Sequence, residues 1–294
     1  MPIYSQTYRT YDGTLRRHFR WWTVAEQELR LLARARIFKG LVLIALLHCL
    51  FYVLIILLNE VYRSNQELFR QSGLGFLTQV REFMVDERLF YMFLRFQSGL
   101  AFLILIYAGS GAISNDFVNN LMEVYFAKPL TWIDYTLGKC CALVLLGLSL
   151  TALPAVLFLA LHNALLADLD QLAANWWWGP ASVGFASAIV VPAALCVLAA
   201  SALSRSQRYA AIAVFMVVIA SSTMGVLLAQ MLRDPQYLIV SVPMVVNRIG
   251  LACFRQRGYL TRIDLGLSLG MLVLVCVTAF WIICRAVRRA EVAA

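Results

Sequence analysis

Few side chains in this sequence are spaced for catalysis or for binding a cofactor. The pair Gly138-Lys139 is followed by cysteine and lacks the first glycine of the pattern Gly-x-x-x-x-Gly-Lys-(Ser/Thr), so it is not a phosphate-binding loop. The histidines His18, His48 and His162 fall in separate elements, and no carboxylate lies in the long apolar runs beside them. Haem sites, metal sites and proton relays at membrane depth usually need such groups together. We therefore expect this chain to have no catalytic residue and to bind no cofactor or metal.

The polar residues 113–139 separate two long apolar runs and look ordered. Asp116 is placed to cap a helix that runs to about Phe126, Lys128 suits the negative end of that helix, and Pro129 is expected to end it. The predicted apolar face comprises Phe117, Leu121, Val124 and Tyr125, and the polar face comprises Asn119, Asn120 and Glu123. The segment is predicted to be a rigid, two-faced strut parallel to the membrane. The alternative is a well-capped loop between two spans that binds no partner.

A second helix is predicted to follow this strut directly. Thr131 and Asp134 have the spacing of a capping box at a helix start. Trp132 and Tyr135 are expected to lie among lipid headgroups, and Lys139 to snorkel toward water from the first turn.

The composition is that of a membrane protein. Hydrophobic residues make up 62% of the chain, charged residues make up 14%, and the mean hydropathy is +0.76. Uncharged runs long enough to cross a bilayer as helices occur at residues 40–58, 96–113, 140–161, 179–203, 209–232 and 265–284. The predicted fold is therefore an all-α integral membrane protein with six transmembrane helices.

Basic residues are distributed unevenly between the two sides of the predicted membrane. The side with the termini carries 15 lysines and arginines, and the other side carries 10. The positive-inside rule therefore predicts that both termini are cytoplasmic. The net charge of +9 is accounted for by this topology, so nucleic acid is not expected as a partner.

An amphipathic helix is predicted at residues 19–39, before the first span. Trp22, Ala25, Leu29 and Leu32 recur at three- and four-residue steps, and Arg30, Arg34 and Arg36 lie beside them. This pattern favours a helix in the headgroup layer with its arginines near anionic lipid. The alternative is a solvated charged helix that leads into span 1.

Prolines and one arginine shape the predictions for the remaining segments. Residues 237–254 are apolar but contain Arg248, which would cost roughly 2.5–3.5 kcal/mol inside a bilayer, so a seventh span is rejected. A re-entrant or surface-lying pair of helices on the outer face is expected instead, with its break at Pro243. Pro154 and Pro192 are expected to kink spans 3 and 4.

The inner loop resembles that of ABC-2 type ABC transporter permeases. The resemblance lies in Asp116 and in residues 123–139, Glu-Val-Tyr-Phe-Ala-Lys-Pro-Leu-Thr-Trp-Ile-Asp-Tyr-Thr-Leu-Gly-Lys. The family typically has an acidic residue after span 2, then an aromatic-small-(Arg/Lys)-Pro-(Leu/Val)-(Ser/Thr) run, then Gly-Lys entering span 3. The motif covers about 25 residues, whereas the six-span layout with its interfacial and outer helices covers most of the chain. One departure is that many relatives carry Glu-x-x-x-Gly-Thr where this chain has Asp-Phe-Val-Asn-Asn-Leu-Met-Glu.

The resemblance implies a permease subunit of an ATP-driven exporter in a bacterial inner membrane. Residues 1–294 would form one transmembrane domain, with a cytoplasmic segment at 1–39, the bundle at 40–285 and a tail at 286–294. The inner loop 114–136 would be a coupling helix in a groove of a separate ATPase, and the second inner loop 204–208 would make a smaller contact. The implied interface consists of Asp116, Phe117, Asn120, Leu121, Glu123, Val124, Tyr125, Lys128, Pro129, Arg205 and Arg208. ATP and Mg²⁺ would bind in that ATPase, and a second permease chain, identical or homologous, would complete the transporter.

Two other classes of function stay open from the residues alone. One is a stand-alone integral-membrane enzyme or assembly factor, which would normally cluster His, Asp or Glu near one leaflet. The other is an ion-coupled secondary transporter, whose coupling ion would need polar ligands inside the spans.

Overall fold

The computed structural model describes residues 19–64, 85–127, 130–166 and 173–293. Of these residues 88% are helical, and they contain no strand. Six helices within them are long and apolar enough to cross a membrane: Arg36–Val61, Glu87–Val118, Trp132–Leu165, Ala173–Leu203, Gln207–Met231 and Leu265–Glu291. The prediction of an all-α chain with six candidate spans is therefore confirmed, and the chain has the character of a multi-pass membrane protein.

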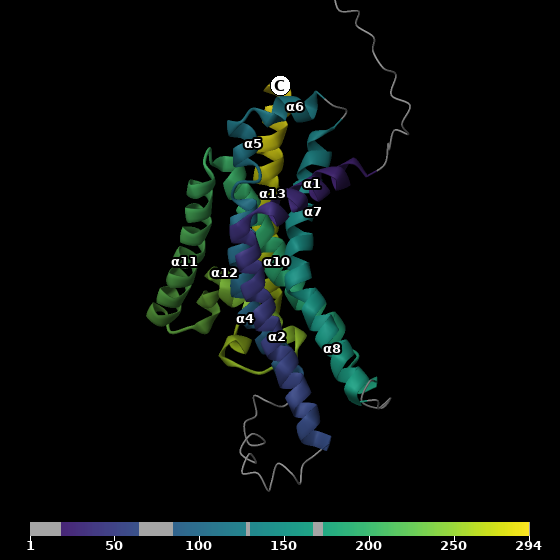
Figure 1. Cartoon of the computed structure of the whole chain (residues 1–294). Helices are drawn as coiled ribbons and strands as arrows, with labels where there is room; N and C mark the ends of the chain where they lie inside the picture. The colour runs from purple at the N-terminus through teal and green to yellow at the C-terminus, as the bar shows by residue number, and fades with distance from the viewer. Residues whose placement is uncertain (1–18, 65–84, 128–129, 167–172, 294) are drawn as a thin grey trace, which may run out of the picture.

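The spans run alternately up and down one bundle (Figure 1). The elements are α1 (Arg20–Arg34), α2 (Arg36–Ser64), α4 (Glu87–Gly109), α5 (Ser114–Val118), α6 (Leu121–Phe126), α7 (Trp132–Leu150), α8 (Ala152–Leu166), α10 (Trp178–Leu203), α11 (Gln207–Met231), η3 (Pro235–Val240), α12 (Val242–Cys253), η4 (Tyr259–Arg262) and α13 (Leu265–Ala293). The short helices α5 and α6 lie at the same end of the bundle as the C-terminal end of α13 (Figure 1). We call α5 and α6 the platform, and this end of the bundle the platform end.

Helix α10 lies at the centre of the bundle and packs against α4, α7, α8, α11, α12 and α13. Glycines allow two of these neighbours to approach closely. A Cβ on Gly109 of α4 would lie 2.7 Å from a methyl carbon of Val197, and one on Gly147 of α7 would lie 2.5 Å from a methyl carbon of Val190. Helix α10 continues through Pro192 without interruption, so Pro192, unlike Pro154 below, does not divide its span.

Span 3 is divided at Thr151 into α7 and α8. Pro154 lacks the N–H that would bond the carbonyl of Leu150 four residues earlier. The side-chain amide of Gln97 in α4 donates to that carbonyl at 2.8 Å, and Nδ1 of His48 lies 2.7 Å from the Gln97 amide oxygen. Because an amide oxygen only accepts, His48 donates from Nδ1. The helix break therefore falls where a kink at Pro154 was expected, and His48 is a hydrogen-bonded residue between α2 and α4.

The segment between spans 5 and 6 forms η3, α12 and η4. Helix α12 has 12 residues, too few to cross a bilayer, and it packs against α10, α11 and α13. The break falls at Ser241, with Pro243 in the first turn of α12. Arg248 donates from Nε to the carbonyl of Ile263 at 2.8 Å. The rejection of a seventh span is therefore confirmed for this segment.

A helix is present before the first span, but α1 ends at Arg34 rather than at residue 39, and its apolar face is used differently from the prediction. Ala25 is fully buried, and Leu29 and Leu32 pack against the core of the bundle rather than facing lipid. The neighbour that α1 covers most extensively is α7. Trp22 keeps 44% of its surface exposed. Most of the predicted lipid-facing stripe is therefore a contact between helices.

Candidate functional site

Three charged side chains from distant parts of the chain meet beneath the platform. Lys139 of α7 is only 2% exposed, and its Nζ lies 2.7 Å from Oε2 of Glu28 in α1 and 3.0 Å from Oδ2 of Asp116 in α5. The hydroxyl of Tyr135, one helical turn before Lys139, donates to the same Asp116 oxygen at 2.7 Å. We call these four residues the ionic cluster. It joins α1, the platform and span 3 through charge-assisted contacts in a buried site.

Several sequence predictions about these residues are wrong. Lys139 does not snorkel to water, because two carboxylates satisfy its charge inside the protein. Tyr135 does not lie among headgroups, since it is fully buried and bonded to Asp116. Asp116 itself is not a helix cap, because it lies inside α5 and its carboxylate points into the cluster.

Local sequence explains how Lys139 reaches this position. The predicted capping box is confirmed, because the Thr131 side chain accepts from the backbone N–H of Asp134 while the Asp134 carboxylate accepts from the N–H of Thr131. One residue before Lys139, Gly138 allows α1 to lie directly on α7. A Cβ there would lie 2.6 Å from Cβ of Val24 and 2.7 Å from the carbonyl oxygen of Trp21. This close crossing brings Glu28, one turn further along α1, to Lys139.

The platform is two helices rather than the single helix predicted. The chain turns at Asn119 and Asn120, and Asn120 has a left-handed backbone with φ of 51°. Asparagine tolerates this conformation better than most residues, because its short polar side chain can bond locally. The predicted strut from Asp116 to Phe126 therefore contains a sharp bend.

Several contacts hold the platform on the bundle. The hydroxyl of Ser201 in α10 accepts from the backbone N–H groups of Ile113 and Ser114, both at 3.0 Å. On the other side, the ring of Tyr125 packs edge-on against Tyr135 with 5.4 Å between centroids. Burial raises the pKa of Tyr125 above its usual value, so its hydroxyl stays neutral at physiological pH.

The outer surface of the platform exposes apolar side chains among polar ones. Val118 and Val124 are each 56% exposed and Leu121 is 37% exposed, and Glu123 is exposed beside them. The predicted division into faces is therefore wrong, because Leu121 and Val124 share the outer surface with Glu123 and with Asn120. Of the predicted apolar face, only Phe117 and Tyr125 turn partly into the bundle.

The predicted site residues separate into three groups. Those on the outer surface of the platform are Asn120, Leu121, Glu123 and Val124; those turned into the bundle are Asp116, Phe117 and Tyr125. Arg205 and Arg208 are exposed at the turn between α10 and α11. This turn adjoins the platform end of α4, because Gln207 donates to the carbonyl of Tyr107 at 3.4 Å. Lys128 and Pro129 lie outside the described residues.

Glu28 and Ser201 are important residues that the sequence patterns did not reveal. For Glu28 a signal exists, because Ala25, Glu28, Leu29 and Leu32 follow the i, i+3, i+4, i+7 spacing of one helical face. An acidic residue within an apolar stripe indicates a buried cationic partner. For Ser201, one serine among the small residues of α10, no local signal distinguishes it.

Within the described residues, no three His, Cys, Asp or Glu side chains come close enough to hold a metal ion. No protein-family model matches this chain, and no curated protein matches it in sequence.

Proposed function

We propose that this chain is the membrane subunit of an ATP-driven ABC-2 type exporter, coupled to a separate ATPase through the platform. The observation that carries the proposal is the combination of a firmly held base and an exposed outer surface at one end of a six-span bundle. Asp116 fixes the base of the platform through Lys139 at 3.0 Å and the Tyr135 hydroxyl at 2.7 Å, and Leu121, Glu123 and Val124 stay exposed on its outer surface. The resemblance of residues 123–139 to the family's inner loop supplies the kind of partner.

The ionic cluster gives this proposal a physical route for force. A force on α6 reaches Asp116, then Lys139, and through Lys139 both α7 and α1. A loop without such contacts would absorb the displacement by bending. ATP and Mg²⁺ bind in the partner ATPase, whose closure moves the platform and with it the spans. A second permease chain completes the pathway across the membrane.

In this proposal the membrane topology also decides on which side of the membrane the remaining features lie. The platform end faces the cytoplasm of a bacterial inner membrane, in keeping with the excess of basic residues on the side of the termini. The α12 segment enters the outer leaflet as a re-entrant element. Helix α1 lies at the cytoplasmic headgroup level with Trp22 toward lipid and Ala25 toward α7.

The test is co-purification of the partner from native membranes in mild detergents. The tagged wild-type chain should retain an ATPase that carries Gly-x-x-x-x-Gly-Lys-(Ser/Thr), identified by mass spectrometry and by its ATP hydrolysis. Val124→Asp should reduce this retention about tenfold or more, because a charge at a desolvated interface position costs well over 1 kcal/mol. The matched control is Tyr259→Asp, a similarly exposed position at the opposite end of the bundle that is 61% exposed.

Equal loss of the ATPase with both variants would mean that the platform is not the docking surface. A wild-type chain that retains no such ATPase in any of several detergents would overturn the proposed function. The chain would then be better described as a stand-alone membrane protein.

A further inference from the structure

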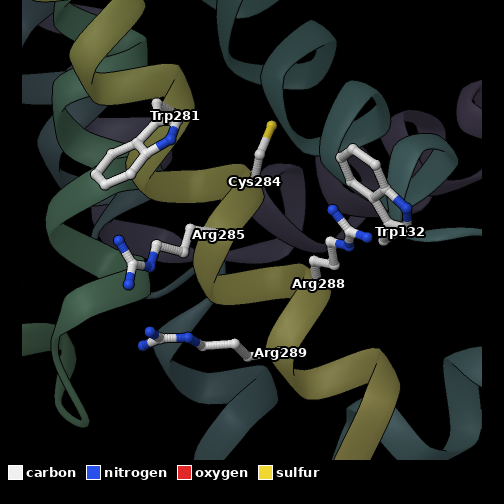
Figure 2. Close-up of a pocket in the computed structure, with 6 residues that line it drawn as sticks. All are labelled: Trp132, Trp281, Cys284, Arg285, Arg288 and Arg289. Atoms are coloured by element: carbon white, nitrogen blue, oxygen red, sulfur yellow. The ribbon is translucent and has the colours of Figure 1, made fainter.

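A basic pocket lies at the platform end of α13, away from the ionic cluster. It has a volume of about 460 Å³ and is lined by Trp132, Trp281, Cys284, Arg285, Arg288 and Arg289. Figure 2 shows Trp281, Arg285 and Arg289 along one side of α13, and Cys284, Arg288 and Trp132 along the other. Five of the six lining residues therefore belong to one helix, and Trp132 at the start of α7 supplies the far wall.

The arginines of this pocket are not neutralised within the part of the chain that the structure describes. No carboxylate there lies within 4.0 Å of the Arg285, Arg288 or Arg289 guanidinium groups. Glu291 is the nearest acid in sequence, and its carboxylate accepts instead from the backbone N–H of Trp132 at 3.2 Å. The Arg285 guanidinium stacks on the ring of Trp281 with 5.1 Å to the centroid, which fixes its plane. The pocket thus presents three positive charges that no described carboxylate compensates.

An exposed apolar stripe leads along α13 to this pocket. Val273, Val277 and Trp281 recur every four residues and are 60%, 60% and 59% exposed, and Leu274 beside them is 56% exposed. The stripe is about two helical turns long, roughly 12 Å at 1.5 Å per residue. A large part of an acyl chain can therefore pack along it. A basic pocket continuous with such a stripe matches an amphiphile with an anionic head and an apolar tail.

We propose that this pocket binds one anionic phospholipid, with its phosphodiester between Arg285 and Arg289, on the Trp281 side of α13, and an acyl chain along the stripe that ends at Trp281. Guanidinium groups suit this ligand because their planar N–H donors pair with two phosphate oxygens at once. A basic flank after a final span attracts anionic lipid diffusely. The pocket adds a defined volume, an oriented guanidinium and an indole on each side, and these features hold one headgroup in place.

The experiment is native mass spectrometry of the purified full chain titrated with phosphatidylglycerol or with phosphatidylcholine of the same acyl chains. We expect one tightly retained phosphatidylglycerol per chain and at least tenfold weaker retention of phosphatidylcholine. Glycerol 3-phosphate serves as the arm that carries the phosphate without the tail. It should bind far more weakly, because it lacks the contact with the stripe.

Two variants separate a built site from diffuse attraction. Arg285→Gln with Arg289→Gln should reduce phosphatidylglycerol retention about tenfold or more, whereas Arg34→Gln with Arg36→Gln, exposed arginines of α1 and α2, should change it less than twofold. Arg285→Lys with Arg289→Lys keeps the charge but loses the paired donors, so it should also weaken retention several-fold. This pair provides the test if the glutamine pair does not fold.

Three results would overturn the proposal. The first is equal loss of lipid with the control pair, and the second is unchanged retention with the lysine pair, since both indicate attraction by net charge alone. The third is glycerol 3-phosphate binding as tightly as the lipid, which would assign the pocket to a soluble phosphate ester.

Discussion

Replacing Lys139 by methionine should be among the most destabilising single substitutions in this protein. Methionine keeps most of the length of the side chain but removes the ammonium group that pairs with Glu28 and Asp116. At an effective dielectric constant of about 20, each contact is worth roughly 6 kcal/mol before desolvation. Desolvation offsets much of this, yet removal of one partner leaves two carboxylates facing each other in a buried site. Breaking buried pairs in this way costs about 3–5 kcal/mol.

The number of charges left in the ionic cluster also predicts how the variants rank in their loss of stability. Glu28→Gln leaves one carboxylate and one ammonium in contact, so it should cost much less than Lys139→Met. Asp116→Asn should lie between them, because it also leaves one carboxylate with Lys139 but replaces the charged acceptor of the Tyr135 hydroxyl by a neutral amide oxygen. The triple variant that combines Glu28→Gln, Asp116→Asn and Lys139→Met removes all three charges together. It should recover most of the stability, because amide and apolar replacements leave no charge unpaired.

The assay is thermal unfolding in detergent, followed by labelling of cysteines with a thiol-reactive fluorophore. Cys140, one of the seven cysteines that can react, adjoins the ionic cluster and is 8% exposed, so its labelling requires this site to open. A loss of 3–5 kcal/mol corresponds to a midpoint lowered on the order of 10 °C in a chain of this size. Lys39→Met, at an exposed lysine of α2, is the control and should shift the midpoint by less than about 2 °C. The reasoning is refuted if Lys139→Met matches that control, or if the triple variant loses the sum of the three single effects.

Two further substitutions test the helix contacts. Gly138→Ala should lower the unfolding free energy by about 1–3 kcal/mol, because its Cβ would meet Val24 and the Trp21 carbonyl at 2.6 Å and 2.7 Å and force α1 away from α7. Gln97→Leu should cost roughly 1–3 kcal/mol, because it leaves the Leu150 carbonyl without a donor at the break in span 3. Both are measured as changes in the thermal midpoint in detergent.

Each of these substitutions has a matched control. Gly99→Ala adds a Cβ with nothing within 4 Å and should leave stability unchanged or slightly higher. Ser98→Ala removes a hydroxyl that bonds the carbonyl of Arg95 in its own helix, so its effect should stay within about 0.5 kcal/mol. A Gly138 or Gln97 variant no less stable than its control would contradict the contact assigned to that residue.

Sequence patterns predicted those parts of the fold that depend on solvent or on neighbouring residues. The six spans follow from hydropathy, because a helix in lipid must be apolar over about 20 residues. The capping box at Thr131 depends on residues three positions apart, and it was predicted correctly. The break at Pro154 follows from the missing N–H of proline, although the donor that replaces it, Gln97, lies on another helix.

Features that depend on contacts between distant segments could not be predicted in the same way. A lysine at the end of an apolar run normally reaches water, so Lys139 was assigned to the surface. Its burial depends on Glu28 and Asp116, and neither lies near it in the sequence. The bend in the platform had a local signal in the consecutive residues Asn119 and Asn120, which indicate a turn as readily as a helix. That signal was outweighed by the apparent helical spacing from Asp116 to Phe126.

The ionic cluster also determines the order in which the helices can pack while the chain is being synthesised. Glu28 is made 111 residues before the lysine that it binds. At about 5–20 residues per second, roughly 6–20 s pass between the two. During that interval α1 has no docking site, because α7 does not yet exist, while α2 and α4 are being synthesised. The first two spans therefore insert before α1 has docked on α7. Docking of α1 on α7 is a late step that closes the platform end only after the third span is in place.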